Sequence, residues 1–198
     1  MKHFKDETLG TKIDLQLIYE PKRLESYWSG SRASATSQNM DLFANYLAER
    51  ESSLLNKATH VLFTGDNNDK VAGIANLNTV CRPYYHPMGN DDNNGYFGPS
   101  IAIVERVHEN KTIGWLLAHE LSHNLGMQHS WEWEDNFGLV PKGYCTNENT
   151  GGIGIMRTLQ PNGRHTWTMC NRCDLLKSYQ THMLKYGKYC LLDLNSED

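Results

Sequence analysis

The chain has 198 residues, of which 39% are hydrophobic and 21% charged, a composition typical of a folded globular protein. It carries 19 lysines and arginines against 23 aspartates and glutamates, and this net charge of -4 excludes a strongly basic protein that binds nucleic acid. No apolar run approaches the ~20 residues of a membrane-spanning helix, so we expect no membrane span. The length of the chain predicts a single domain.

The hydrophobic pattern predicts alternating strands and helices in the first half of the chain. Alternation of apolar and polar residues predicts a strand at Ile13–Tyr19, and helical spacing predicts an amphipathic helix over residues 38–56. Short β-prone runs then predict three strands, at His60–Thr64, Val71–Leu77 and Ser100–Val104.

The second half of the chain begins with one strong helix and then loses its periodicity. Thr112 is the expected N-cap of a helix that runs to about Leu125 and ends before Gly126. Residues 130–169 are rich in Gly, Asn and Thr, which predicts irregular structure, and Asp174–Tyr186 is predicted to be the last helix.

The most informative stretch reads HELSHNLGMQH and begins at His119. On a helix, His119 and His123 lie ~40° apart, and Glu120 lies ~100° from His119. Two imidazoles one turn apart can bind one metal ion but leave half of its tetrahedron open. A residue free to adopt positive φ, Gly126, can end the helix and return His129 as a third ligand.

Three neutral nitrogen ligands and one open position are typical of a catalytic zinc site. Zinc lowers the pKa of a water molecule, and Glu120 is placed to accept its proton. The alternative is accidental spacing, but five specified positions arise by chance about 3 times in 10^7 per starting point. The sequence therefore favours a zinc site with Glu120 as general base.

This motif is the zinc signature of the metzincin metalloproteases, in which a methionine turn follows the third histidine. Gly154-Ile155-Met156 resembles that turn and implies that Met156 forms an apolar floor under the zinc ligands. The chain is most similar to the adamalysin (reprolysin) family, especially its ADAMTS-type catalytic domains, over roughly Phe4 to Asp193. Further stretches that carry the resemblance are Phe63-Thr64-Gly65, Gly73-Ile74-Ala75, Ser100–Val104, Trp167–Asn171 and Tyr189–Asp193.

The resemblance implies one metalloprotease catalytic domain over residues 1–198, with a zincin-like α/β fold. An upper subdomain, residues 1–129, would contain a twisted mixed β-sheet and the active-site helix. A smaller, irregular subdomain, residues 130–198, would contain the C-terminal helix. We expect a secreted, monomeric endopeptidase with one zinc per chain. Its protein or peptide substrate would lie extended along the edge strand at Gly73–Val80.

Five cysteines leave two interpretations open, because an odd number fits either two disulfides with a spare thiol or a reduced chain. Cys170 and Cys173 have the spacing of a zinc or redox pair, but no second pair completes a four-thiolate site. The resemblance implies disulfides Cys81–Cys190 and Cys145–Cys170 and leaves Cys173 unpaired.

The sequence departs from the family pattern at several positions. Ser130 replaces the Asp that usually follows the third histidine, and Gly154 replaces a Cys that often precedes the methionine turn. The family's calcium site stays open for this chain. Asp193 and the Cys190 carbonyl fit two of its ligands, but Ala58 stands where an acidic ligand is expected.

Two other classes of protein compete with an enzyme. A zinc-holding module that binds a partner without cutting it has no need of a carboxylate at Glu120. A purely structural zinc site would have four protein ligands rather than three. Both alternatives are therefore less favoured than an endopeptidase.

Overall fold

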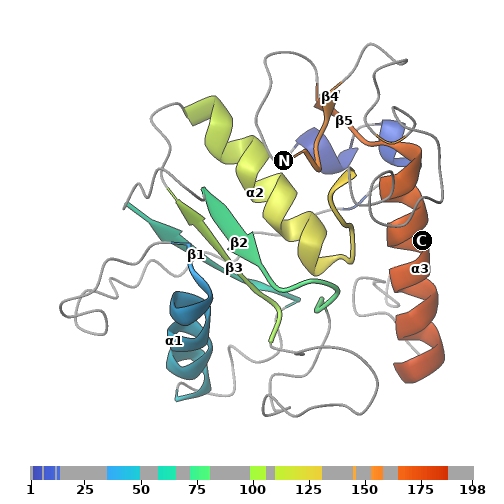
Figure 1. The fold of residues 1–198 in the computed structure, drawn as a ribbon. Coiled ribbons are helices and arrows are strands. Elements are labelled where there is room, and N and C mark those ends of the chain that lie inside the picture. Colours follow the sequence, from blue (N-terminus) through green and yellow to red (C-terminus); the bar gives the residue numbers. More distant parts are fainter. Residues whose placement is uncertain are drawn as a thin grey trace, which may run out of the picture.

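A computed structural model shows an α/β fold with a small mixed sheet and three α-helices (Figure 1). The structure describes residues 2–5, 7–11, 13, 35–49, 58–65, 72–80, 99–105, 110–130, 145, 153–157 and 165–186. Two short 3-10 helices, η1 (Lys2–Lys5) and η2 (Glu7–Leu9), open the chain. Among the described helices, none is long and apolar enough to cross a membrane.

The sheet has the strand order β1-β3-β2. Strand β1 (His60–Thr64) is parallel to β3 (Ile101–Glu105), and β2 (Gly73–Ala75) is antiparallel to β3. In this register Gly73 lies opposite Val104. Strand β2 therefore forms one edge of the three described strands, and β3 lies at the centre.

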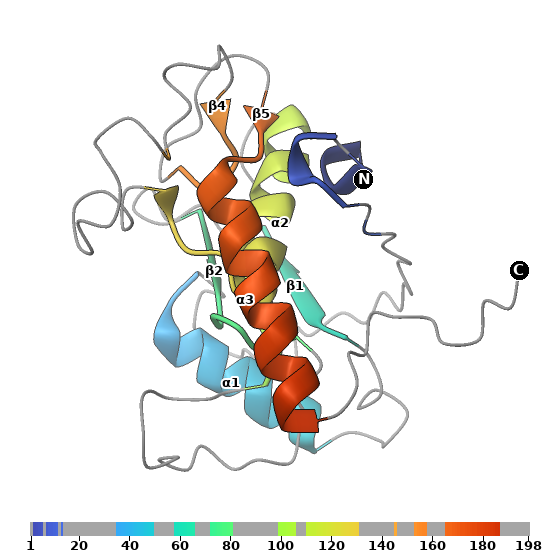
Figure 2. The ribbon, with the colours of Figure 1, turned by 90° about the vertical axis from the view of Figure 1, so that its right-hand side faces the viewer.

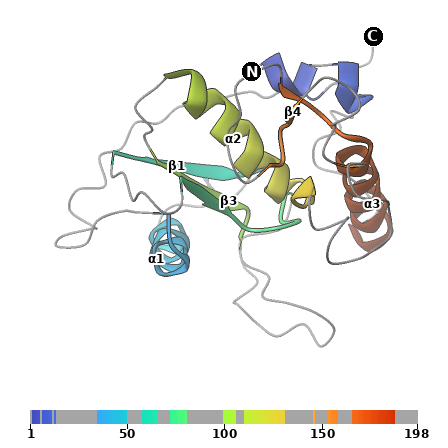
Figure 3. The same ribbon diagram turned by 45° about the horizontal axis from the view of Figure 1, so that its top comes forward.

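Helices cover both faces of the sheet, so the central strand β3 is buried along its whole length. Helix α1 (Ser37–Ala48) lies on one face and α2 (Asn110–Asn124) on the other (Figures 1 and 3). Side chains alternate between the two faces of a strand. Ile101 and Ile103 accordingly pack in the cluster of α1, whereas Val104 packs in the cluster of α2.

Helix α3 (Met169–Tyr186) lies beside α2, which separates α3 from the sheet (Figures 1 and 2). Two short parallel strands, β4 (Ile153–Gly154) and β5 (His165–Thr166), lie near its start. The Phe4 ring of η1 packs against Trp167, with ring centroids 5.4 Å apart. The N-terminal segment is thus part of the core around α2.

The fold confirms the α/β prediction and most of the predicted elements. The strand at His60–Thr64 is confirmed, β2 is shorter than predicted, and β3 is shifted by one residue. Helix α1 is capped by the Thr36 side chain and leaves helical structure at Glu49, earlier than predicted. Of the predicted strand at Ile13–Tyr19, residues 14–19 lie outside the described part of the chain.

Both later helices begin earlier than the sequence predicted. Helix α2 starts at Asn110, so the prediction of Thr112 as its N-cap is wrong. Helix α3 starts at Met169 because Thr168 and Asn171 cap it reciprocally. The Asn171 amide donates to Thr168 Oγ1 at 3.1 Å, and the Thr168 amide donates to Asn171 Oδ1 at 3.1 Å.

Asn124, the last residue of α2, bonds to β3 and to the segments that flank β1 and β2. Its side-chain amide donates to the carbonyls of Asn76 (2.8 Å) and Ile101 (3.1 Å) and to the Thr79 hydroxyl (3.3 Å). Its oxygen accepts from the Thr59 hydroxyl at 2.7 Å. Asn124 is 1% exposed. This one amide therefore fixes where α2 ends on the sheet.

We predict that Asn124→Ala lowers the free energy of unfolding by about 3 kcal/mol, because several buried polar groups lose their partner at once. Urea-induced unfolding measures this loss. Asn45→Ala is the matched control, since Asn45 is exposed on α1, and its effect is expected within about 0.5 kcal/mol. A loss below about 1 kcal/mol for Asn124→Ala contradicts the assigned role.

Candidate active site

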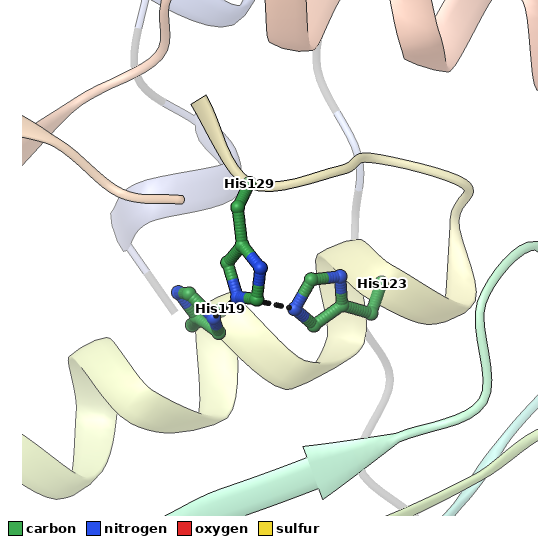
Figure 4. A group of neighbouring side chains, drawn as sticks. All are labelled: His119, His123 and His129. Atoms are coloured by element: carbon green, nitrogen blue, oxygen red, sulfur yellow. Dashed lines mark hydrogen bonds between the residues drawn. The ribbon is translucent and has the colours of Figure 1, made fainter. Parts of the chain in front are cut away.

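Three histidines converge on one point at the end of α2 (Figure 4). His119 and His123 lie one turn apart on the helix, and His129 reaches them from the segment that follows it. The Nε2 atom of His129 lies 3.2 Å from Nε2 of His119 and 3.2 Å from Nε2 of His123. One ring nitrogen from each histidine lies within 4.8 Å of the other two. A single metal ion can bind all three.

The chain turns back after α2 through Gly126, which has a φ of +95°. Its amide donates to the His123 carbonyl at 2.9 Å, and the Met127 amide donates to the Ser122 carbonyl at 2.9 Å. These bonds close the helix end in the way that favours glycine. A Cβ atom on Gly126 would also lie 2.8 Å from the Ser178 Cβ of α3. Glycine is needed here for both conformation and space.

Backbone carbonyls fix the orientation of two of the imidazole rings. His119 Nδ1 lies 2.8 Å from the Ile155 carbonyl, and His123 Nδ1 lies 2.8 Å from the Met127 carbonyl. Because a carbonyl only accepts, we assign the ring proton to Nδ1 in both histidines. Their Nε2 lone pairs then point toward the shared centre, as metal ligands require.

The turn that contains Met156 lies directly against this site. Met156 is fully buried in the same apolar cluster as Trp115 and Leu121 of α2. The turn supplies the Ile155 carbonyl to His119, and the Met156 carbonyl accepts from the Ser130 amide at 3.1 Å. It therefore holds both the first ligand and the segment after the third. The role of Met156 as a floor under the metal stays a prediction.

Two positions around the turn depart from the family pattern, and their packing can be described. A Cβ atom on Gly154 would lie 3.3 Å from Thr168 Cγ2 and 3.4 Å from the Ser130 hydroxyl. A larger residue at Gly154 would therefore crowd both neighbours. The Ser130 hydroxyl is buried and has no hydrogen-bond partner among the described residues.

Asp174 of α3 supports His129, a role that sequence reasoning missed. Its carboxylate accepts from the backbone amide of Gln128 at 3.0 Å, and it is 4% exposed. Gln128 directly precedes His129, so this bond fixes the backbone from which the third imidazole projects. The two partners are 46 residues apart, and no local sequence pattern announces the contact.

Burial favours the neutral form of His119 and His123. The pKa of His119 is lowered to about 4, chiefly by burial; the hydrogen bond to Ile155 raises the pKa, and the neighbouring His129 lowers it. Burial also holds the pKa of His123 well below its usual value, with added contributions from His119 and His129. Neutral imidazole is the form that binds a metal, so protons compete weakly for this site at neutral pH.

Glu120 follows His119 on α2 and is 3% exposed. Burial raises the pKa of its carboxyl group to about 8. Its side chain packs against Gly73 of β2, where an added Cβ atom would lie 2.8 Å from Glu120 Cδ and 2.9 Å from Cγ. Sequence reasoning placed Gly73 on the edge strand but missed this contact. A glycine inside a β-prone run was the available signal.

Cys145 and Cys170 form a disulfide with a Cα–Cα distance of 5.6 Å, the pairing that the family resemblance implied. Cys173 is a free, exposed thiol. Cys81, Cys190 and Asp193 lie outside the described residues, so the second disulfide and the calcium ligands stay predictions.

An α/β fold with two histidines of this triad on α2 and the third on the segment after it is consistent with a metzincin catalytic domain. The comparison with protein families agrees. The model of the family described as metallo-peptidase family M12B, reprolysin-like, matches residues 4–130, more than half of the chain. The chain belongs to this metallopeptidase family, which confirms the resemblance found in the sequence. A peptidase of this family acts on a protein or peptide substrate.

Gly126→Ala is expected to lower the affinity for Zn²⁺ at least tenfold, because Cβ strain and the contact with Ser178 shift the turn that presents His129. Competition with a chelating dye measures the affinity. Gly114→Ala is the matched control, since a Cβ at this position on α2 meets nothing within 4 Å. Equal affinities for the two variants would contradict the role given to the turn.

In metal-free protein we expect the His119 ring to stay neutral down to about pH 4, whereas it titrates near 6.5 in urea-unfolded chain. NMR of the imidazole nitrogens measures both midpoints. As pH falls, His119 is protonated in the unfolded state before it is protonated in the folded state. The free energy of unfolding is therefore unaffected by His119 above pH 6.5 and decreases between pH 6.5 and pH 4. The total decrease is about 3 kcal/mol.

The loss of stability is measured by urea-induced unfolding at several pH values in metal-free Glu120→Gln. This variant is used because the raised pKa of the Glu120 carboxyl group makes the wild-type protein more stable as pH falls, which would mask the effect of His119. A folded-state midpoint for His119 at or above pH 6 is incompatible with this prediction.

Proposed function

We propose that this domain is a zinc-dependent endopeptidase that hydrolyses peptide bonds of extracellular proteins. The observation that carries the proposal is the convergence of three imidazole nitrogens, all within 4.8 Å of one another, in a chain of the M12B family. Nitrogen ligands of this kind suit zinc, and three of them leave a coordination position for chemistry. When bound, zinc supplies Lewis-acid polarisation of a carbonyl group and activation of water.

Glu120 is the proposed general base. It takes a proton from the attacking water and later passes it to the amine that leaves. Burial disfavours the charged form of the Glu120 carboxyl group. The positive charge of a bound metal ion would favour the ionised form that the reaction needs. The preceding residue on the helix is His119, so the base and the first ligand share one rigid element.

An extended substrate is proposed to pair with the open edge of β2. Ala72 accepts from the Glu105 amide, and the Asn76 amide donates to Ile101, so these residues direct their backbone groups toward β3. Hydrogen bonding alternates along an antiparallel strand. The backbone groups of Gly73 and Ala75 therefore point away from β3 and are available to a substrate strand.

The disulfide supports the proposal of a secreted protein, because such bonds persist in oxidising compartments. We propose that the domain acts as a monomer with one zinc per chain. Calcium binding stays open: Ala58 is partly buried against the core and offers no acidic side chain.

The main alternative is a zinc-holding module that binds a partner protein, and Glu120 separates it from an enzyme. Glu120→Gln is expected to keep one zinc per chain but to lower turnover by 10²-fold or more, because the amide cannot accept the proton. His129→Ala is expected to lose zinc and activity together. Elemental analysis and cleavage of casein, with and without 1,10-phenanthroline, measure both properties.

The outcomes separate the alternatives. A parent protein that holds one zinc and cleaves neither casein nor a peptide library supports the binding module. More than about a tenth of parental turnover in Glu120→Gln shows that another group is the base. Zinc retained by His129→Ala would remove that histidine from the ligand set.

A further inference from the structure

Gly73 is the first residue of the edge strand β2, and it lies at the contact between this strand and α2. Ile74 packs in the cluster of α1, on the opposite face of the sheet. Because side chains alternate along a strand, Gly73 and Ala75 face α2. Gly73 thus lies on the face of the sheet that Glu120 of α2 contacts.

The Glu120 side chain fills the space that a residue at position 73 would use. A Cβ atom there would overlap Glu120 Oε1 and would lie 2.8 Å from Cδ and 2.9 Å from Cγ. Three successive atoms of the glutamate line the glycine, so rotation of the carboxylate alone does not relieve the overlap. Glu120 is 3% exposed, which leaves little room for the whole side chain to move.

Backbone conformation does not explain the glycine. Gly73 lies within a strand and does not have the positive φ of Gly10 or Gly126. Glycine inside a strand weakens it, since it adds chain entropy and packs no side chain. The close approach of Glu120 is the feature that requires it.

We infer that Gly73 is a positioning residue for Glu120. The bare backbone of the edge strand forms the wall against which the glutamate rests, and it sets the direction of the carboxylate. The inference rests on the proposed function, in which Glu120 is the general base. The backbone groups of Gly73 also face the open edge of the sheet, so one residue places both the base and the proposed substrate strand.

The contact is tested first by thermal unfolding of metal-free protein, which needs no activity. Gly73→Ala is expected to lower Tm by about 5 °C. In a Glu120→Ala background the same substitution is expected to cost nothing, because the shortened side chain makes room for the new methyl group. Gly65→Ala is the control, since a Cβ there meets nothing within 4 Å, and its shift is expected to be equal in both backgrounds.

The positioning role is then tested by kinetics on the zinc-loaded enzyme. Gly73→Ala is expected to keep one zinc per chain and a KM within about twofold, while kcat falls about tenfold or more. In a Glu120→Gln background, Gly73→Ala is expected to change the residual rate less than about twofold, because it acts through Glu120. A residue that acted on the substrate itself would lower the rate equally in both backgrounds.

Each outcome decides the inference. Equal Tm losses for Gly73→Ala with Glu120 and with Ala at position 120, or an unchanged kcat in an active enzyme, overturn the inference alone. A parent protein that binds zinc but cleaves no peptide overturns the proposed function and the inference with it, even if the Tm values are coupled. A Tm loss for Gly73→Ala that disappears in the Glu120→Ala background, together with a lower kcat and an unchanged KM, supports the inference.

Discussion

Three imidazole nitrogens that face one centre place a strong constraint on this fold, because lone pairs on all three would repel one another unless a cation lay between them. The protein holds the rings from outside. One carbonyl comes from the turn after α2, another from the methionine turn, and Asp174 of α3 fixes the backbone before His129. Parts of the chain distant in sequence must therefore come together before the three histidines share a metal.

The two glycines at the site meet different physical demands. Gly126 adopts a backbone conformation that other residues enter only with strain, and it also allows α3 to approach. Gly73 has an ordinary strand conformation and provides only space for Glu120. Conformation governs where the third ligand lies, whereas space governs where the proposed base lies. The geometry of metal and base thus depends on the absence of side chains at two separate places.

Sequence reasoning located the site because its geometry is local. The angular spacing of His119 and His123 and the turn at Gly126 follow from helix geometry alone. It missed the contact of Gly73 with Glu120 and the bond from Gln128 to Asp174, because these partners lie on elements that only the tertiary fold brings close. The start of α3 was misplaced for a smaller reason: Thr168 and Asn171 cap each other with an asparagine where a glutamate or glutamine is the usual signal. The sequence thus predicted the features that depend on residues close together in the chain, but not the contacts between distant elements.

The segment that leaves β2 completes the end of α2. The Asn78 amide donates to the His123 carbonyl, and the amides of Thr79 and Val80 both donate to the Asn124 carbonyl. The edge strand and the metal-binding helix are therefore one mechanical unit. Replacing residues 76–80 with the corresponding segment of a related protein would therefore also alter the end of α2 that positions His123. Substitutions in segments that make no hydrogen bond to the end of α2 leave the position of His123 unchanged.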